Sequence, residues 1–192
     1  MGCDIHIYSE RFDAETFKWV VITNKDEWSY NFYNNQLQKI LSDNKSHIKS
    51  IFNGEITQLE SNIKESENTI NWLPGDRNYS GFGYIADVRN YNNEIEPFKK
   101  GGEDDPSNYD LSPELEFKLE EWGPDFHSFV VYTDEEIEIA VKQLKDKHNN
   151  KSISSIEYEY ITEFLKNNFV EPLKKLKMKY KEQIRFVIFF DN

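Results

Sequence analysis

The first residues of the chain carry two side chains whose types and spacing could do chemistry. Polar and apolar residues alternate from Cys3 to Tyr8, which is the period-two pattern of a half-buried β-strand. Asp4 and His6 therefore point to one face of this strand, while Ile5 points to the other. A carboxylate and an imidazole placed in this way can share a metal ion or act as an acid–base pair.

The same spacing recurs far along the chain, where Asp125 and His127 flank Phe126. The chain has four histidines, and the other two, His47 and His148, lie in polar, helix-like surroundings. Each Asp-x-His would also fit a surface pair, or an aspartate that holds a buried histidine in one tautomer. Because the chain has two such pairs, each on a strand-like stretch, we expect the two pairs to lie together in one site.

The expected site combines two imidazoles with carboxylates from three places in the sequence. The predicted metal ligands are Asp4, His6, Asp125, His127 and Asp191, and the first four of these are also the predicted catalytic residues. Nitrogen and oxygen ligands of this kind suit Zn²⁺, Mn²⁺, Ni²⁺ or Fe²⁺, and a bound divalent metal ion activates water. For Asp191, at the end of a strand-like stretch, a carboxylate in solvent is the alternative.

Two arginines close to glycines could hold an anion. Arg77 precedes a turn-rich stretch with Gly81 and Gly83, where the backbone can approach a ligand, and Arg89 follows that stretch. The predicted substrate-binding residues are Arg77, Asn78, Tyr79, Arg89 and Ser128. Arginines in an acidic chain also pair with surface carboxylates, so a structural role for both is the alternative.

The overall charge limits the partners of such a site. The chain has 192 residues, a formal net charge of −12 and a pI of about 4.8, which argues against a long nucleic acid held through its phosphates. One cysteine excludes an intrachain disulfide, and no apolar run resembles a signal peptide or a membrane span. We therefore expect a cytoplasmic protein with a small anionic or nucleotide-like ligand and no membrane partner.

Periodicity and capping signals predict a single α+β domain over residues 1–192. Strands are expected at 3–12, 17–24, 127–132 and 185–191, in an antiparallel or mixed sheet that includes the N- and C-terminal strands. Helices are expected at 113–122, 134–147 and 154–182, the last bent near Pro172, and the helices 134–147 and 154–182 should pack on this sheet. Residues 72–83 should form a loop and 84–88 a short strand or helix. The nearly all-apolar C-terminal strand is expected to be central.

Residues 34–71 differ in character from the rest of the chain. They are rich in Asn, Lys, Glu and Ser, and their apolar residues recur at helical spacing. Asn53 and Gly54 interrupt this spacing, which predicts two helices in a hairpin. We expect a helical insertion at the periphery of the domain.

Four short blocks, in the same order, resemble those of a family of small uncharacterised proteins found mainly in bacteriophages and prophages. The blocks are the opening Met1–His6, the Arg-Asn-Tyr to Val-Arg block at Arg77–Arg89, the Trp-x-x-Asp-x-His-Ser block at Trp122–Ser128 and the closing Arg185–Asp191. Residues 99–107 depart from the Arg-Gly-Leu-Pro often found in this family, and the segment 34–71 looks like an insertion that its shorter relatives lack.

Together these features predict a phage-type metal-dependent hydrolase that acts on a small phosphorylated or nucleotide-like substrate. The phage resemblance implies counter-defence in the cytoplasm of a bacterial host, against a host nucleotide or a nucleotide defence signal. The alternative is a non-catalytic binding protein that sequesters such a signal through aromatic stacking and arginine–phosphate contacts. A nucleic-acid mimic would leave both Asp-x-His pairs unexplained, and a homo-oligomer is compatible with every one of these functions.

Overall fold

The computed structural model describes residues 4–23, 25, 27–42, 53–67, 78–91, 95–102 and 104–191. The chain divides into two compact units, Thr23–Trp72 and the larger remainder, Met1–Ile22 with Leu73–Asn192. Within the described ranges, the larger unit carries the strands and the smaller unit is helical. No helix in these ranges is both long and apolar enough to cross a membrane.

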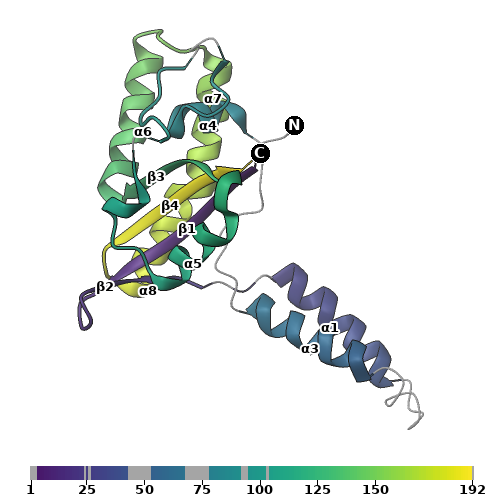
Figure 1. Ribbon diagram of the computed structural model, residues 1–192. Helices are drawn as coiled ribbons and strands as arrows, with labels where there is room; N and C mark the ends of the chain where they lie inside the picture. The colour runs from purple at the N-terminus through teal and green to yellow at the C-terminus, as the bar shows by residue number, and fades with distance from the viewer. Residues whose placement is uncertain are drawn as a thin grey trace. The chain divides into compact units, whose positions relative to one another are not determined.

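The larger unit is built on a four-stranded antiparallel sheet with the strand order β2–β1–β4–β3 (Figure 1). The strands are β1 (Asp4–Asp13), β2 (Lys18–Val21), β3 (His127–Thr133) and β4 (Ile184–Asp191). β1 and β4 are the inner strands, so segments from opposite ends of the sequence lie side by side. β4 is buried from Ile184 to Phe190, which confirms the central strand expected from its apolar sequence.

Helices complete an α+β architecture, which confirms the predicted fold class. The helices described in the larger unit are α4 (Tyr79–Ala86), α5 (Pro113–Trp122), α6 (Asp134–Asn149), α7 (Ser155–Leu165) and α8 (Glu171–Tyr180), with the short turns η2 (Pro106–Asn108), η3 (Gly123–Asp125) and η4 (Lys166–Val170). Thr133 and Ser154 form capping boxes at the starts of α6 and α7, close to where the sequence predicts these helices to begin.

The helix predicted over 154–182 is divided into α7, the π-helical turn η4 and α8. Pro172 lies in the first turn of α8. It has no N–H to donate, and in a regular α-helix its ring would clash with the carbonyl four residues earlier. The wider π turn accommodates this proline, so the expected bend takes the form of a π segment.

The two faces of the sheet are covered by different elements. Phe190 of β4 packs against Phe82 of α4, with ring centroids 5.3 Å apart. Phe189 points to the opposite face, because side chains alternate along a strand, and meets Trp122 at the end of α5. α4 therefore covers the Phe190 face and α5 covers the Phe189 face (Figure 1).

The described residues of the smaller unit form two helices that pack on each other, α1 (Glu27–Ser42) and α3 (Asn53–Glu67). Leu37 and Leu59 are buried in these helices. The predicted helix pair is confirmed within the described residues, but α1 begins earlier than expected. Asn53 and Gly54 open α3 instead of separating two helices, because a glycine costs less in a first turn than in a helix interior. The other expected helical positions, 43–52 and 68–71, lie outside the described residues.

A buried ion pair joins the two inner strands. Glu10 and Arg185 are direct register partners and are 0% and 5% exposed. Arg185 Nε donates to Glu10 Oε2 at 2.6 Å, and Arg185 Nη2 donates to the Asp110 carbonyl at 2.6 Å. Ser112 N–H donates to Glu10 Oε1 at 2.7 Å, and the guanidinium lies 4.0 Å from the centre of the Trp19 ring. Burial lowers the pKa of Arg185 from its ordinary value, and the charge of Glu10 opposes that shift.

We expect Glu10→Gln to destabilise the protein by about 3–5 kcal/mol, because it leaves the Arg185 charge buried without a counter-charge. The matched control is Glu182→Gln, which breaks the partly exposed pair between Arg11 and Glu182 at 2.8 Å and should cost about 1 kcal/mol or less. Chemical denaturation measures both free energies of unfolding. Equal losses of unfolding free energy in the two variants would show that the buried pair stabilises the protein no more than the Arg11–Glu182 pair does.

We also expect the larger unit to fold without the smaller one. Replacing residues 24–72 with a short glycine–serine linker should leave a single cooperative thermal transition, because the sheet and its covering helices all belong to the larger unit. Circular dichroism at increasing temperature measures this transition. An insoluble product, or one that melts without cooperativity, would mean that the helix pair supplies part of the core.

Candidate functional site

Asp4, His6 and Asp191 share one face at one end of the inner strands. Asp4 is the register partner of Asp191, and His6 is the partner of Phe189. His6 Nε2 lies 3.3 Å from Asp191 Oδ2, and these two side chains are 13% and 16% exposed. The Asp4 backbone N–H donates to Asp191 Oδ1 at 3.2 Å. The antiparallel register therefore brings a terminal carboxylate of β4 onto the imidazole of β1.

Aromatic rings surround this imidazole. The ring centroid of His6 lies 5.0 Å from that of Phe189, in a stacked arrangement, and 4.5 Å from that of Trp122. Tyr8 stacks on the same Phe189 ring at 5.4 Å. Burial, together with the charges of Glu121 and Asp191, raises the pKa of Tyr8 to about 12. The Tyr8 hydroxyl, which at its ordinary pKa of 10.0 is already protonated at neutral pH, can donate a hydrogen bond.

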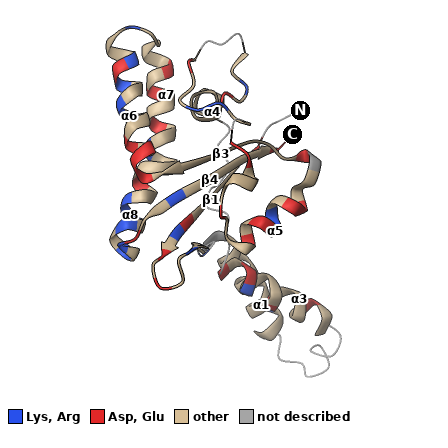
Figure 2. Ribbon diagram, turned by 60° about the vertical axis from the view of Figure 1, so that its left-hand side comes forward, with Lys and Arg blue, Asp and Glu red and all other residues tan. Residues whose placement is uncertain are grey.

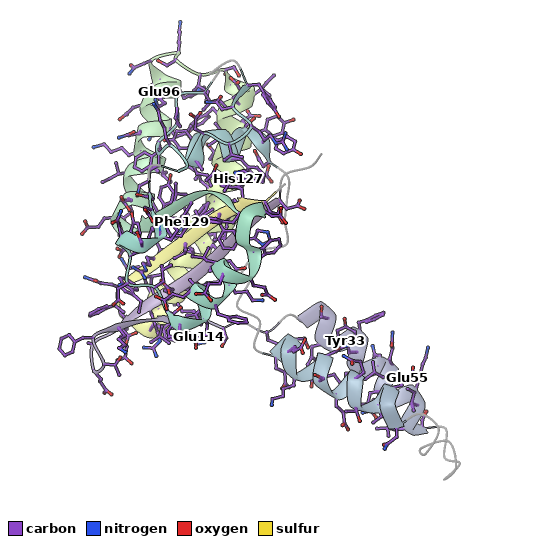
Figure 3. All side chains as sticks on the ribbon, viewed as in Figure 1. Tyr33, Glu55, Glu96, Glu114, His127 and Phe129 are labelled. Carbon is purple, nitrogen blue, oxygen red and sulfur yellow. The ribbon has the colours of Figure 1, made fainter. Side chains whose placement is uncertain are left out.

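The predicted convergence of the two Asp-x-His pairs is wrong. His127 is the register partner of Phe190, and its ring stacks on Phe190 with centroids 6.1 Å apart. Since Phe189 and Phe190 are neighbours in one strand, His6 and His127 lie on opposite faces of the sheet. Figure 3 shows His127 at the start of β3. Asp125 precedes that strand in η3 and is exposed.

The register of β3 on β4 causes this separation, because a shift of one residue would move every side chain of β3 to the other face. An irregularity lies between His127 and Val130, where Ser128 has the left-handed φ of 55°. His127 Nδ1 lies 2.9 Å from Ser128 Oγ. A Cβ added at Gly101 would come within 2.6 Å of both Ser128 Cβ and the Ala86 carbonyl oxygen. Glycine is therefore required where this loop passes the bulge.

The described substrate-binding candidates have local structural partners. Asn78 caps α4: its side chain accepts from Gly81 N–H at 2.8 Å and donates to the Tyr160 carbonyl at 3.0 Å. Tyr79, expected in a loop, is the first residue of α4 and is 42% exposed. Arg89 donates to the Tyr91 hydroxyl at 2.6 Å. Ser128 is the bulge residue already described, and Arg77 lies outside the described residues.

The candidate metal site has fewer ligands than the five that the sequence predicts. No group of three or more His, Cys, Asp or Glu side chains that could hold a metal ion is found among the described residues, so the five predicted ligands are not assembled. His6 Nε2 is buried and makes no hydrogen bond within the described part of the chain, although Asp191 Oδ2 is 3.3 Å away. Two ligands at about 2.1 Å from one tetrahedral Zn²⁺ are about 3.3–3.4 Å apart. The His6–Asp191 pair therefore fits two positions on one metal ion, with Asp4 on the same face.

Sequence reasoning missed two members of this site. Tyr8 shares the face of His6 by simple alternation, so its place was visible in the sequence. Trp122 comes from the end of α5, and no local pattern indicates that this helix lies over His6.

Scans of protein-family models, of curated proteins and of solved structures found no match to this chain.

The left-handed backbone at Ser128 gives a stability prediction. Ser128→Gly and Ser128→Ala both remove the hydroxyl that contacts His127, but only glycine adopts a φ of 55° without strain. We expect the free energy of unfolding to be about 1 kcal/mol higher for Ser128→Gly than for Ser128→Ala. Denaturant titration of both variants measures the difference, and a more stable alanine variant would contradict the strain argument.

Proposed function

We propose that this protein is a metal-dependent hydrolase whose metal-binding pair is His6 and Asp191, with Asp4 on the same face. The observation that carries the proposal is the buried, unbonded His6 Nε2 at 3.3 Å from Asp191 Oδ2. A buried nitrogen that makes no hydrogen bond is costly unless something else satisfies it. A divalent metal ion would satisfy both the nitrogen and the neighbouring carboxylate, and when bound it would supply Lewis-acid activation of water.

The side chains around this pair hold it in position. The His6 ring is fixed between Phe189 and Trp122, so its nitrogen keeps one direction. The Asp4 N–H binds one oxygen of Asp191, which leaves the other oxygen facing His6. The same rings exclude water from the inner side of the pair, which strengthens electrostatic interactions there.

A small phosphorylated or nucleotide-like substrate suits this site when a cation is present. The surrounding carboxylates, Asp4, Asp191 and Glu121, would repel a phosphate in a chain of net charge −12. A divalent ion would offset that charge and attract the phosphate. The half-exposed Trp122 ring offers a surface on which a base can stack. The phage resemblance favours a host nucleotide or a nucleotide defence signal as the substrate, in the cytoplasm of the bacterial host.

The second candidate is a protein that sequesters such a nucleotide without reaction. The aromatic surroundings of His6 favour it, because Trp122 and Tyr8 would contribute to binding whether or not chemistry follows. Both functions use one site, so they are separated by the fate of the ligand.

We expect His6→Ala and Asp191→Asn each to weaken binding of Zn²⁺ or Mn²⁺ at least about tenfold, because each removes a direct ligand. His127→Ala is the matched control: the sequence assigns it to the same metal, but it lies on the other face of the sheet and should bind the metal normally. Isothermal titration calorimetry measures these affinities. Equal losses in His6→Ala and His127→Ala would reject the reduced site.

Incubation of the metal-loaded protein with a panel of nucleotides, followed by heat release and chromatography, separates the two functions. Altered product that disappears in Asp191→Asn indicates the hydrolase. Intact nucleotide recovered from the protein indicates sequestration. Recovery of neither would reject both proposals.

A further inference from the structure

Positive charge gathers on one segment of this acidic chain. Between positions 166 and 181 the sequence has six lysines, Lys166, Lys174, Lys175, Lys177, Lys179 and Lys181, against the single acidic residue Glu171. All six lysines are exposed. Figure 2 shows basic residues on α8, while the chain as a whole carries −12. The segment therefore attracts partners that the rest of the surface repels.

An apolar groove runs beside these lysines, between α6, α7, η4 and α8. It consists of two adjoining cavities of about 300 Å³ each, which share the lining residues Val141, Val170 and Lys174. Val141 stays 39% exposed, so the groove is open to solvent. The π turn η4 supplies both Lys166 and Val170 to the lining of the groove. π-helical turns are rare and are found frequently at functional sites.

Lysines border the groove along its length. Lys145 and Lys166 border one cavity, Lys177 borders the other and Lys174 borders both. Glu138 and Glu171 also line the groove, and Lys174 pairs with Glu171 at 3.0 Å. Lys177 pairs with Asp134 at 2.6 Å, so four lysines face three carboxylates at the groove, and the rim keeps a small excess of positive charge in a chain that is acidic overall.

We propose that this groove binds an acidic amphipathic helix of a partner protein. The apolar lining matches the apolar stripe of such a helix, and the lysine rim matches acidic residues on either side of the stripe. Along α6 the lining extends from Ile137 to Lys145, about 12 Å at 1.5 Å per residue, which accommodates anchors at positions i, i+4 and i+7. A helix needs only one face buried, whereas a small ligand needs most of its surface enclosed, so the open groove favours the helix.

The site is independent of the His6–Asp191 pair, since its residues come from other elements and belong to neither the metal ligands nor their aromatic neighbours. An experiment that rejects one of the two proposals therefore does not affect the other.

The test uses the full chain and a labelled helical peptide of about four turns, with leucines at i, i+4 and i+7 and glutamates elsewhere. Fluorescence anisotropy should detect binding, and Val141→Asp should weaken it at least about tenfold, because the new carboxylate would be buried unpaired under the peptide. Ile139→Asp is the matched control. Ile139 lies on the same helix and is 47% exposed, but it lines neither cavity, so its affinity should change by less than about twofold.

Lys166→Glu should also weaken binding of the acidic peptide. It should strengthen binding of a matched peptide that has lysines in place of the glutamates. Equal binding of the acidic and basic peptides, equal effects of Val141→Asp and Ile139→Asp, or no binding at about 1 mM would each overturn the proposal. So would oligomers of the protein that Val141→Asp dissociates in sedimentation experiments, because the occupant would then be a second copy. Capture by anionic phospholipid vesicles that depends on Val141 would instead assign the groove to a lipid surface.

Discussion

The buried pair of Glu10 and Arg185 is the interaction on which the sheet depends. Removing two charges from water costs more than their attraction returns unless the remaining donors and acceptors are also satisfied. Here the Ser112 N–H and the Asp110 carbonyl complete the pair, so the loop before α5 is fixed to the same point as the two inner strands. A shift of β1 along β4 would leave both charges buried and unpaired. The pair therefore selects one register among several that apolar contacts alone would allow.

That register also creates the candidate site. Counting outward from Glu10 opposite Arg185 sets His6 opposite Phe189 and Asp4 opposite Asp191. The imidazole thus reaches a carboxylate that is 185 positions away in sequence, without any loop being required to place it. α5 then brings Trp122 over the ring, and the segment before α5 is the one that contacts Glu10 and Arg185. One electrostatic contact thereby orders both walls of the site, the sheet below the imidazole and the helix above it.

Charge is distributed unevenly over the larger unit, and the two proposed binding sites follow that distribution. The His6 site is lined by carboxylates, which suits a cation and, through it, an anionic substrate. The groove beside α8 is bordered by lysines and floored by apolar residues such as Val141 and Val170, which suits an acidic amphipathic partner. Pro172 contributes to the second site indirectly, because the π turn that accommodates its ring carries Lys166 and Val170.

The sequence by itself determined the local structure and one half of the site. Alternation from Cys3 to Tyr8 predicted the strand and the shared face of Asp4 and His6, capping boxes at Thr133 and Ser154 located two helix starts, and the apolar run before Asp191 predicted a central strand. These signals are local, since side-chain period and cap chemistry depend on neighbouring residues. Only the tertiary structure decided which strands pair and in which register. It placed Asp191 beside His6 through the β1–β4 register, which the long-range contact of Glu10 with Arg185 fixes. It turned His127 to the opposite face through the register of β3 on β4. No local pattern encodes either register.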